Sequence, residues 1–333
     1  MLTGDFVFVG DVGRPDLLDE AAGGIDTHFK GAKDIFVSLR DRFLTLPDYV
    51  QVLPAHGSGS ACGKALGAIA ASTVGYERAF AWWAKYLAAD DEQGFIDELL
   101  SGQPDAHAYF ARMKTQNRVG PAVMGTQPEL LEYTGETLTP ELEADRVIFV
   151  DTRPNTFVHE GTVERSLNIP GLDKAASYGA WVYDPEREHR PLVLLASSRG
   201  EAGRMRDHLV RVGIDTVRGF ITTLDGFDLV RPTLVGPEEL EGFDRVMLLD
   251  VRNKTEYVDG HLPGAEQLSG GRVMWNLDRL RRNGTIVTYC RSGVRNAVAS
   301  SALRREGFDI AELDGSYLAW TKFQEHGSAL LNA

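Results

Sequence analysis

The sequence predicts an α/β protein in which short buried strands alternate with helices and form parallel sheets. Apolar runs at residues 147–150 and 285–289 have the length of buried strands, and each is followed by a polar loop and then by helical apolar spacing. The pattern is duplicated, since Asp151 and Asp250 end similar strands 99 residues apart. The first third of the chain lacks this repeat and joins glycine-rich turns through apolar strands.

Length and composition limit the possible classes of protein. A chain of 333 residues with 43% hydrophobic residues is long enough for two or three domains with real cores. The net charge of −13 argues against nucleic acid or an anionic membrane as a general partner. No apolar run approaches the roughly 20 residues that a membrane-spanning helix needs, and no basic leader segment opens the chain. We therefore expect a cytoplasmic protein, and its two distant cysteines predict no disulfide framework.

The N-terminal part, residues 1–120, is predicted to be an α/β domain of its own. Residues 2–17 (LTGDFVFVGDVGRPDL) join two glycine-rich turns through an apolar strand, and residues 50–57 (VQVLPAHG) end a second strand near His56. Residues 76–87 read as one helix that is dense in aromatic side chains. A large exposed apolar patch of this kind normally marks an interface.

The middle part, residues 122–231, parallels the C-terminal part, residues 233–333. Residues 147–153 (VIFVDTR) correspond to residues 246–252 (VMLLDVR), and residues 192–200 (LVLLASSRG) fall 93 residues before the corresponding loop of the last part. Gly120-Pro121 precedes the middle part, and Arg231-Pro232-Thr233 separates it from the last part. Two parallel-sheet domains of similar architecture are therefore expected.

Cys290 is the main candidate for a reactive group. It lies between a predicted strand, residues 285–289, and a helix predicted over residues 296–305 with amphipathic spacing. Backbone N–H groups of the loop, two nearby arginines and the positive end of the helix dipole favour the thiolate. The alternative is an inert buried cysteine at a strand end.

These residues resemble those of rhodanese sulfurtransferases. The loop at residues 290–295 (CRSGVR), the strand end at residues 248–252 (LLDVR) and the segment at residues 256–265 (EYVDGHLPGA) match three ordered motifs of that family. The resemblance implies that Cys290 takes a sulfane sulfur as a persulfide and passes it to a thiophilic acceptor, with no cofactor. The loop has the sulfur-transfer length, since related phosphatases use one residue more. The implied catalytic residues are Cys290, Arg291, Ser292, Gly293, Val294 and Arg295.

The middle copy lacks the groups that this chemistry needs. Ser197 stands where the cysteine would be, and Ala202 replaces the second arginine. A serine hydroxyl cannot hold transferable sulfur, so we interpret residues 122–231 as a catalytically silent rhodanese-like domain. Ser197 as an activated nucleophile is the alternative, but no histidine base lies near it in sequence.

Residues 1–120 resemble the C-terminal half of the metallo-β-lactamase fold, an αββα sandwich, as found in bacterial persulfide dioxygenases that carry rhodanese domains. Residues 57–64 (GSGSACGK) and 72–77 (STVGYE) support this match. The resemblance implies Fe(II) held by two histidines and one aspartate, with Asp5 as the aspartate. The family's histidine motif precedes that turn, outside this sequence, and His56 matches a second-metal ligand of dinuclear relatives. One carboxylate and one histidine fall short of the usual iron triad, so we expect an incomplete site.

Half of a sandwich would leave an apolar face open. A second copy of the chain, a separate N-terminal half or the rhodanese-like domains are the candidate covers, and a shortened reading frame is a further explanation.

Three functional classes follow. The leading one is a sulfurtransferase of sulfur metabolism that acts on thiosulfate or low-molecular-weight persulfides, with thiols as acceptors. The second is a persulfide dioxygenase–rhodanese fusion with an incomplete iron domain. The third is a non-catalytic module in which Cys290 senses persulfide.

Overall fold

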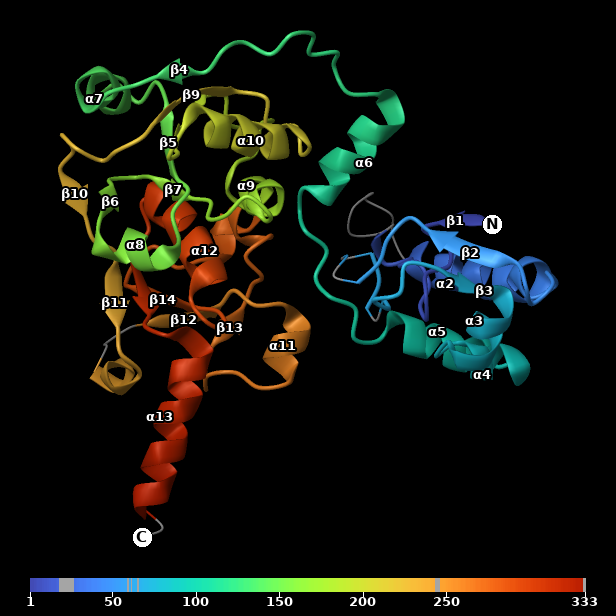
Figure 1. Cartoon of the computed structure of the whole chain (residues 1–333). Helices are drawn as coiled ribbons and strands as arrows, with labels where there is room; N and C mark the ends of the chain where they lie inside the picture. Colours follow the sequence, from blue (N-terminus) through green and yellow to red (C-terminus); the bar gives the residue numbers. More distant parts are fainter. Residues whose placement is uncertain (18–26, 59, 61, 65, 243–245, 332–333) are drawn as a thin grey trace. The chain divides into compact units, whose positions relative to one another are not determined.

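The computed structural model describes residues 1–17, 27–58, 60, 62–64, 66–242 and 246–331 (Figure 1). It divides into two compact units: Met1–Ala106 with Phe110–Lys114, and His107–Tyr109 with Thr115–Ala333. Gly59 and Ala61 of the glycine-rich segment at residues 57–64 lie outside the described residues.

The first unit contains a three-stranded sheet and short helices. Strand β1 (Leu2–Gly4) pairs in parallel with β2 (Gln51–Pro54), and β2 pairs antiparallel with β3 (Ser72–Thr73). The other elements are α2 (Thr27–Ser38), the π-helical turn η1 (Leu39–Phe43), α3 (Val74–Phe80), α4 (Ala84–Ala88) and α5 (Glu92–Leu100). Helix α6 (Phe110–Val119) begins in this unit and ends in the second. A core that includes Phe36, Phe43 and Trp83 draws side chains from α2, η1, β2, α3, α4 and α5.

The expectation of one helix over residues 76–87 was wrong. The chain turns extended at Ala81, with φ −66° and ψ 143°, and this ends α3 before α4 begins. The break places Trp83 in the core, where its ring meets Phe43 edge-on at 6.1 Å. Tyr76 and Phe80 stay outside and contact each other at 5.1 Å, with Phe80 73% exposed. Burial of the tryptophan therefore outweighs continuity of the helix.

The second unit contains two five-stranded parallel sheets with the same strand order. The first runs β4-β9-β8-β5-β7 and the second β11-β15-β14-β12-β13, so corresponding strands occupy corresponding places. We call residues 131–230 the first sheet region and residues 233–331 the second sheet region. The sequence-based expectation of two parallel-sheet α/β parts is confirmed.

The bounds of the elements are as follows. The first sheet region contains β4 (Leu131–Glu132), α7 (Gly135–Glu143), β5 (Ile148–Asp151), α8 (Asn155–Glu160), β6 (Thr162–Val163), β7 (Leu167–Asn168), α9 (Ala175–Val182), β8 (Leu192–Leu195), α10 (Arg199–Val210), β9 (Val217–Ile221) and β10 (Leu229–Val230). The second contains β11 (Thr233–Val235), η2 (Pro237–Gly242), β12 (Met247–Asp250), α11 (Lys254–Val258), β13 (Glu266–Gln267), η3 (Val273–Trp275), η4 (Leu277–Arg279), β14 (Ile286–Tyr289), α12 (Val294–Arg305), β15 (Ile310–Leu313) and α13 (Ser316–Leu331).

Helix α12 joins the two sheet regions. It begins two residues earlier than expected. The sequence predicted an amphipathic helix, but the residues from Asn296 to Leu303 are all buried. The reason is that α12 packs both on β14 and β15 of its own sheet and on β7 and α9 of the first region (Figure 1). Asn168 in β7 donates its N–H to the Ser301 hydroxyl at 2.9 Å, which fixes this contact.

A buried hydrogen bond also crosses between the sheet regions. His159 in α8 lies 3.2 Å from the carboxylate of Glu312 in β15, whose side chain is 1% exposed. Asn296 and Arg304 from α12 donate to the same carboxylate at 3.2 and 2.8 Å. Such partners offset the cost of burying a charge. These contacts hold the carboxyl end of β15 in the second sheet beside α8 of the first region.

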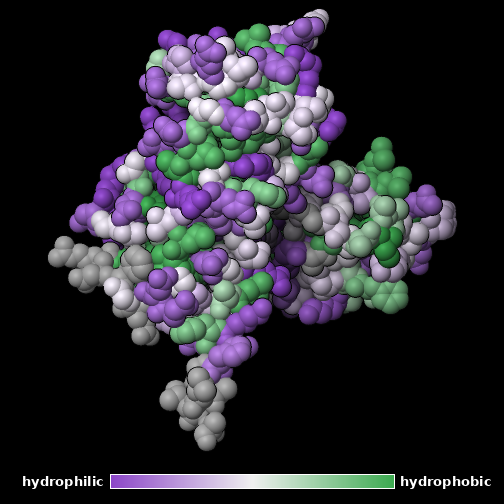
Figure 2. All heavy atoms as spheres, turned by 60° about the vertical axis from the view of Figure 1, so that its left-hand side comes forward, coloured by the Kyte–Doolittle hydropathy of each residue, from purple (hydrophilic) through white to green (hydrophobic). Residues whose placement is uncertain are grey.

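On the face drawn in Figure 2, hydrophilic residues are widely spread and hydrophobic residues form several separate patches. None of the helices among the described residues is long and apolar enough to cross a membrane.

Candidate functional site

Cys290 lies at the turn between strand β14 and helix α12, as the sequence predicts. Its side chain is buried, with 1% of the residue exposed, and the backbone N–H of Gly293 donates to its sulfur at 3.1 Å. Gly293 has φ 108°, a backbone conformation that side-chain-bearing residues rarely adopt. The loop thus bends sharply and directs a main-chain donor at the sulfur.

Ser316 is a member of this site that sequence reasoning missed. Its hydroxyl oxygen accepts the N–H of Cys290 at 3.3 Å and lies 4.0 Å from the sulfur. Ser316 is fully buried at φ 57°, a left-handed conformation that is strained for serine. The N–H groups of Tyr317 and Leu318 then donate to the carbonyls of Cys290 and Arg291 at 3.0 and 3.1 Å. The start of α13 therefore holds the cysteine loop. The only sequence signal for the role of Ser316 was its position after Gly315.

Arg295 is bound by a carboxylate instead of standing free for a substrate. Its guanidinium donates to both oxygens of Glu256 in α11, at 2.6 and 2.8 Å. Burial alone would lower the pKa of Arg295, but the hydrogen bonds and charge of Glu256 and the charge of Cys290 raise it. Burial alone would raise the pKa of Glu256, but Arg295 lowers it. The pair ties the start of α12 to the 256–265 segment.

The other predicted loop residues lie at the surface. The side chains of Arg291 and Ser292 are exposed, and Val294 is 37% exposed. Cys290 and Gly293 are buried at the centre of the loop, with Arg295 partly buried beside them. The six predicted residues therefore form a buried inner set and an outer set that faces solvent.

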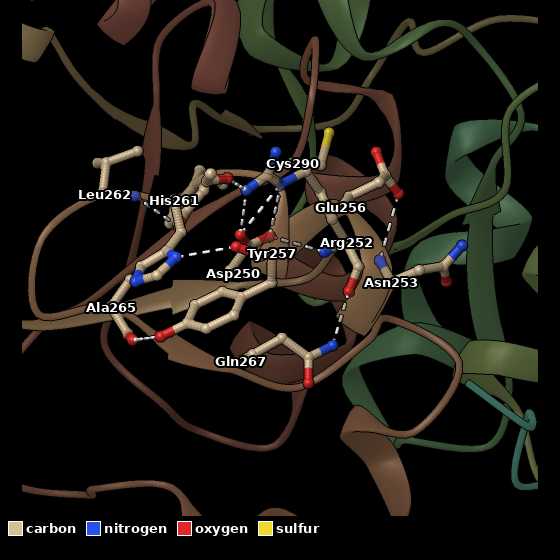
Figure 3. A network of polar contacts seen from close by, with 12 residues as sticks. Asp250, Arg252, Asn253, Glu256, Tyr257, His261, Leu262, Ala265, Gln267 and Cys290 are labelled. Carbon is tan, nitrogen blue, oxygen red and sulfur yellow. Dashed lines mark hydrogen bonds and ion pairs between the residues drawn. The ribbon is translucent and has the colours of Figure 1, made fainter. Parts of the chain in front are cut away.

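The Asp250–Arg252 motif holds the neighbouring chain in place (Figure 3). Arg252 donates to Asp250 at 2.6 Å and to the carbonyl of Gly260 at 2.7 Å, and its guanidinium lies 4.1 Å from the centre of the Tyr317 ring. Burial alone would lower the pKa of Arg252, but Asp250 raises it. His261 stacks on Tyr257 with ring centres 3.7 Å apart. Arg252 is connected to the cysteine loop through Tyr317, whose N–H donates to the Cys290 carbonyl. The sulfur of Cys290 points away from these motif residues (Figure 3).

The corresponding loop of the first sheet region contains its own anion. The N–H of Ser197 donates to the Glu201 carboxylate at 2.7 Å, and the Ser197 hydroxyl donates to the same oxygen. These hydrogen bonds lower the pKa of Glu201. Ala202, which stands in place of Arg295, is fully buried. With the offset of 99 residues between Asp151 and Asp250, Phe157 stands in place of Glu256. Both members of the Arg295–Glu256 pair are therefore absent from this region.

Asp5 and His56, the two candidate metal ligands, lie together in the first unit. The His56 Nε2 atom is 3.1 Å from Asp5 Oδ1, and 68% of the Asp5 side chain is exposed. Within the described ranges, no third histidine, cysteine, aspartate or glutamate completes a metal-binding group. Two ligands do not fit the triad that iron of this type requires.

Residues 238–323 match the family model of the rhodanese-like domain. The thiosulfate sulfurtransferase GlpE of Pseudoalteromonas translucida is 31% identical over 83 residues, which are 25% of this chain and 79% of that protein. A sulfurtransferase of Allochromatium vinosum is 29% identical over 86 residues, 26% of this chain and 80% of that protein. The chain therefore belongs to the rhodanese-like family. The domain and these relatives support sulfurtransferase as its general class.

Two further proteins are matched over part of their length. The chain covers 27% of the probable adenylyltransferase/sulfurtransferase MoeZ of Mycobacterium tuberculosis, at 30% identity over 105 residues, or 29% of this chain. A crystal structure of a metallo-beta-lactamase from Staphylococcus aureus subsp. aureus COL is similar over 67% of this chain and 59% of that chain. Its TM-score is 0.56 and its identity is 32%. This similarity and the C-terminal rhodanese-like domain confirm the predicted fold class.

Proposed function

We propose that this protein transfers sulfane sulfur through a persulfide on Cys290. The observation that carries the proposal is the sulfur of Cys290 at the turn from β14 to α12, with the Gly293 N–H 3.1 Å away. A main-chain donor and a helix N-terminus both stabilise a negative charge on sulfur. The named sulfurtransferase relatives support this chemistry, and thiosulfate or a low-molecular-weight persulfide is the proposed donor.

Two half-reactions complete the cycle. The Cys290 thiolate attacks the outer sulfur of thiosulfate, the S–S bond of thiosulfate breaks, and sulfite leaves with the electron pair. The product is a persulfide whose terminal sulfur carries the negative charge. A thiolate or cyanide then attacks this terminal sulfur, and the bond to Cys290 breaks to restore the thiolate.

We further propose that the chain is divided into residues 1–120, 122–231 and 233–333, and that the middle part is a rhodanese-like domain without transfer activity. The shared strand order supports the duplication. The Glu201 carboxylate occupies the N–H of the Ser197 loop, and its charge would repel an anionic donor. Ser197 also offers no thiolate.

The test is intact-mass measurement after incubation with thiosulfate. One sulfur atom, about 32 Da, should add to Cys290, because the site stabilises the thiolate that accepts it. Cys290→Ser should abolish cyanide-dependent thiocyanate formation. Cys62→Ser, the matched control in the first unit, should keep most of it. Wild-type turnover by Cys290→Ser would refute the proposal.

The metallo-beta-lactamase similarity and the Asp5–His56 pair favour one second candidate, a persulfide dioxygenase–rhodanese fusion with an incomplete iron domain. Because these two residues do not fit an iron triad, no reaction step is assigned to iron.

A further inference from the structure

A cavity of about 330 Å³ lies between the two sheet regions, at the end of α12 opposite the cysteine loop. Its walls come from the end of α9 and the loop that follows it, from η3 and η4, and from the last turn of α12. The apolar part of the lining includes Val182, Tyr183, Met274, Trp275, Leu277 and Ala302. Small-molecule sites have volumes of roughly 300–1,000 Å³ and mostly apolar walls. The cavity is therefore large enough for a small organic ligand.

Arg305, the last residue of α12, contributes a charge to this cavity. Its side chain is 9% exposed, and its guanidinium donates to the carbonyl of Arg165 at 3.0 Å and lies 3.5 Å from the carboxylate of Asp145. That carboxylate is shared, because Arg190 donates to its other oxygen and the Arg165 guanidinium lies 3.9 Å away. One carboxylate thus faces three guanidinium groups.

The electrostatic surroundings of Arg305 agree with this count. Burial and the positive charges of Arg190 and Arg165 lower the pKa of Arg305, and the opposing effects of Asp145 and Glu188 are smaller. A buried charge that is only partly compensated gains from a further counter-ion.

The acidic groups of the cavity are paired or exposed. Glu188 accepts the Arg190 Nε–H at 2.8 Å and a second hydrogen bond from the same guanidinium. Asp184 lies 3.5 Å from Arg187, and Glu306 is exposed to solvent. The buried charge that remains open to a ligand is therefore the guanidinium at the end of α12.

Arg305 also lines a second cavity, of about 370 Å³, which otherwise belongs to the first sheet region. Four carboxylates and two guanidinium groups line this second cavity, from Glu143, Asp145, Glu164, Asp228, Arg165 and Arg305. Its excess of negative charge repels an anion. The cavity between the sheet regions has equal numbers of the two charges, and it is the better site for an anionic ligand.

We propose that the cavity between the sheet regions binds a small organic acid with an apolar, aromatic body, whose carboxylate pairs with Arg305. The planar guanidinium can donate two parallel hydrogen bonds to a carboxylate, which gives both strength and orientation. The half-buried side chains of Met274 and Trp275 offer apolar surface to the body of the ligand. The site is separate from the sulfur-transfer site, because the 12 residues of α12 span about 18 Å between them. The proposal does not rest on sulfur transfer.

The test compares two probes of the same shape on the full chain by isothermal titration calorimetry. The acid is 3-phenylpropionate, and its uncharged counterpart is 3-phenyl-1-propanol. One molecule of the acid should bind per chain, about tenfold more tightly than the alcohol, because only the acid can pair with the guanidinium. Equal affinities for the two probes, or no heat from the acid at millimolar concentration, would overturn the proposal.

Arg305→Gln should weaken binding of the acid about tenfold and leave binding of the alcohol unchanged. Arg281→Gln is the matched control, because Arg281 lies in the same sheet region but makes an exposed pair with Glu266 at 3.6 Å. It should change neither affinity. Unchanged binding of the acid by Arg305→Gln, or an equal loss in the control, would contradict the assignment. Near-ultraviolet circular dichroism checks that each variant retains its fold.

Two further measurements locate the probe. Ala302→Leu adds volume to the cavity wall and should weaken binding of both probes about tenfold, even if Arg305→Gln fails to fold; unchanged affinities would show that the probes bind elsewhere. Excess thiosulfate should leave binding of the acid unchanged, because Cys290 lies at the other end of α12. Displacement by thiosulfate would place the acid at the cysteine loop and refute the proposal. Absence of persulfide formation would refute sulfur transfer but would not alter these binding results.

Discussion

Replacing Glu256 by glutamine tests whether the carboxylate that binds Arg295 organises the sulfur site. The variant keeps the shape of the side chain but removes the charge that accepts both guanidinium hydrogen bonds, at 2.6 and 2.8 Å. The Arg295 charge would then remain partly buried without its partner. We expect lower stability and a less ordered start of α12.

The structure sets the magnitude. The side chains of Arg295 and Glu256 are 23% and 30% exposed, so the pair lies between surface pairs, worth about 0.2–1 kcal/mol, and buried pairs, whose disruption costs about 3–5 kcal/mol. We expect a loss of about 2 kcal/mol in the free energy of unfolding at neutral pH. The kcat/KM with thiosulfate should fall about tenfold, which corresponds to about 1.4 kcal/mol.

Urea unfolding and thiocyanate kinetics measure both effects. Glu266→Gln is the control, because Glu266 makes an exposed pair with Arg281 at 3.6 Å in the same region and should change stability by under about 1 kcal/mol. Since the pKa of Glu256 is lowered in the folded state, its stabilisation is present above the ordinary glutamate value of about 4.3 and is lost as pH falls through the folded value. The difference from wild type should therefore shrink in acid. Equal stability and turnover at pH 7 would refute the role of the pair.

Two further predictions concern the rest of the chain. Ser197→Cys in a Cys290→Ser background should be nearly inactive in thiocyanate formation, because Glu201 already binds the loop N–H and repels an anionic donor; robust turnover would show a working second site. The purified chain should hold far less than one iron and consume no oxygen with glutathione persulfide, because Asp5 and His56 supply only two ligands. Metal analysis and an oxygen electrode check this, and tightly held stoichiometric iron would contradict it.

The local part of the site could be predicted from the sequence because its chemistry lies within one strand–loop–helix segment. Cys290 follows the apolar run of β14 directly, and Gly293 marks the bend before α12. The duplicated architecture was also readable, since each sheet repeats the same order of apolar runs. Periodicity and spacing along the chain are sufficient for such features.

The contacts between distant segments could not be predicted in this way. Ser316 reaches the cysteine from 26 positions downstream, and Glu256 binds Arg295 across 39 positions. Asn155, whose side-chain amide lies against Gly293, comes from the other sheet region altogether. The amphipathic interpretation of α12 failed for the same reason, because the first region covers the side that a lone domain would expose to water.

Helix α12 makes the stability of the second sheet region depend on the first. Its residues from Asn296 to Leu303 are buried, partly against β7 and α9, and Ser301 accepts a hydrogen bond from Asn168. A protein fragment containing only the second region would lack this cover. The side of α12 that packs against the first region would then be exposed to water. Recombination that separated the regions would therefore remove the support of the helix that begins at the cysteine loop. The first sheet region contains no cysteine, yet the helix that follows Cys290 depends on its shape.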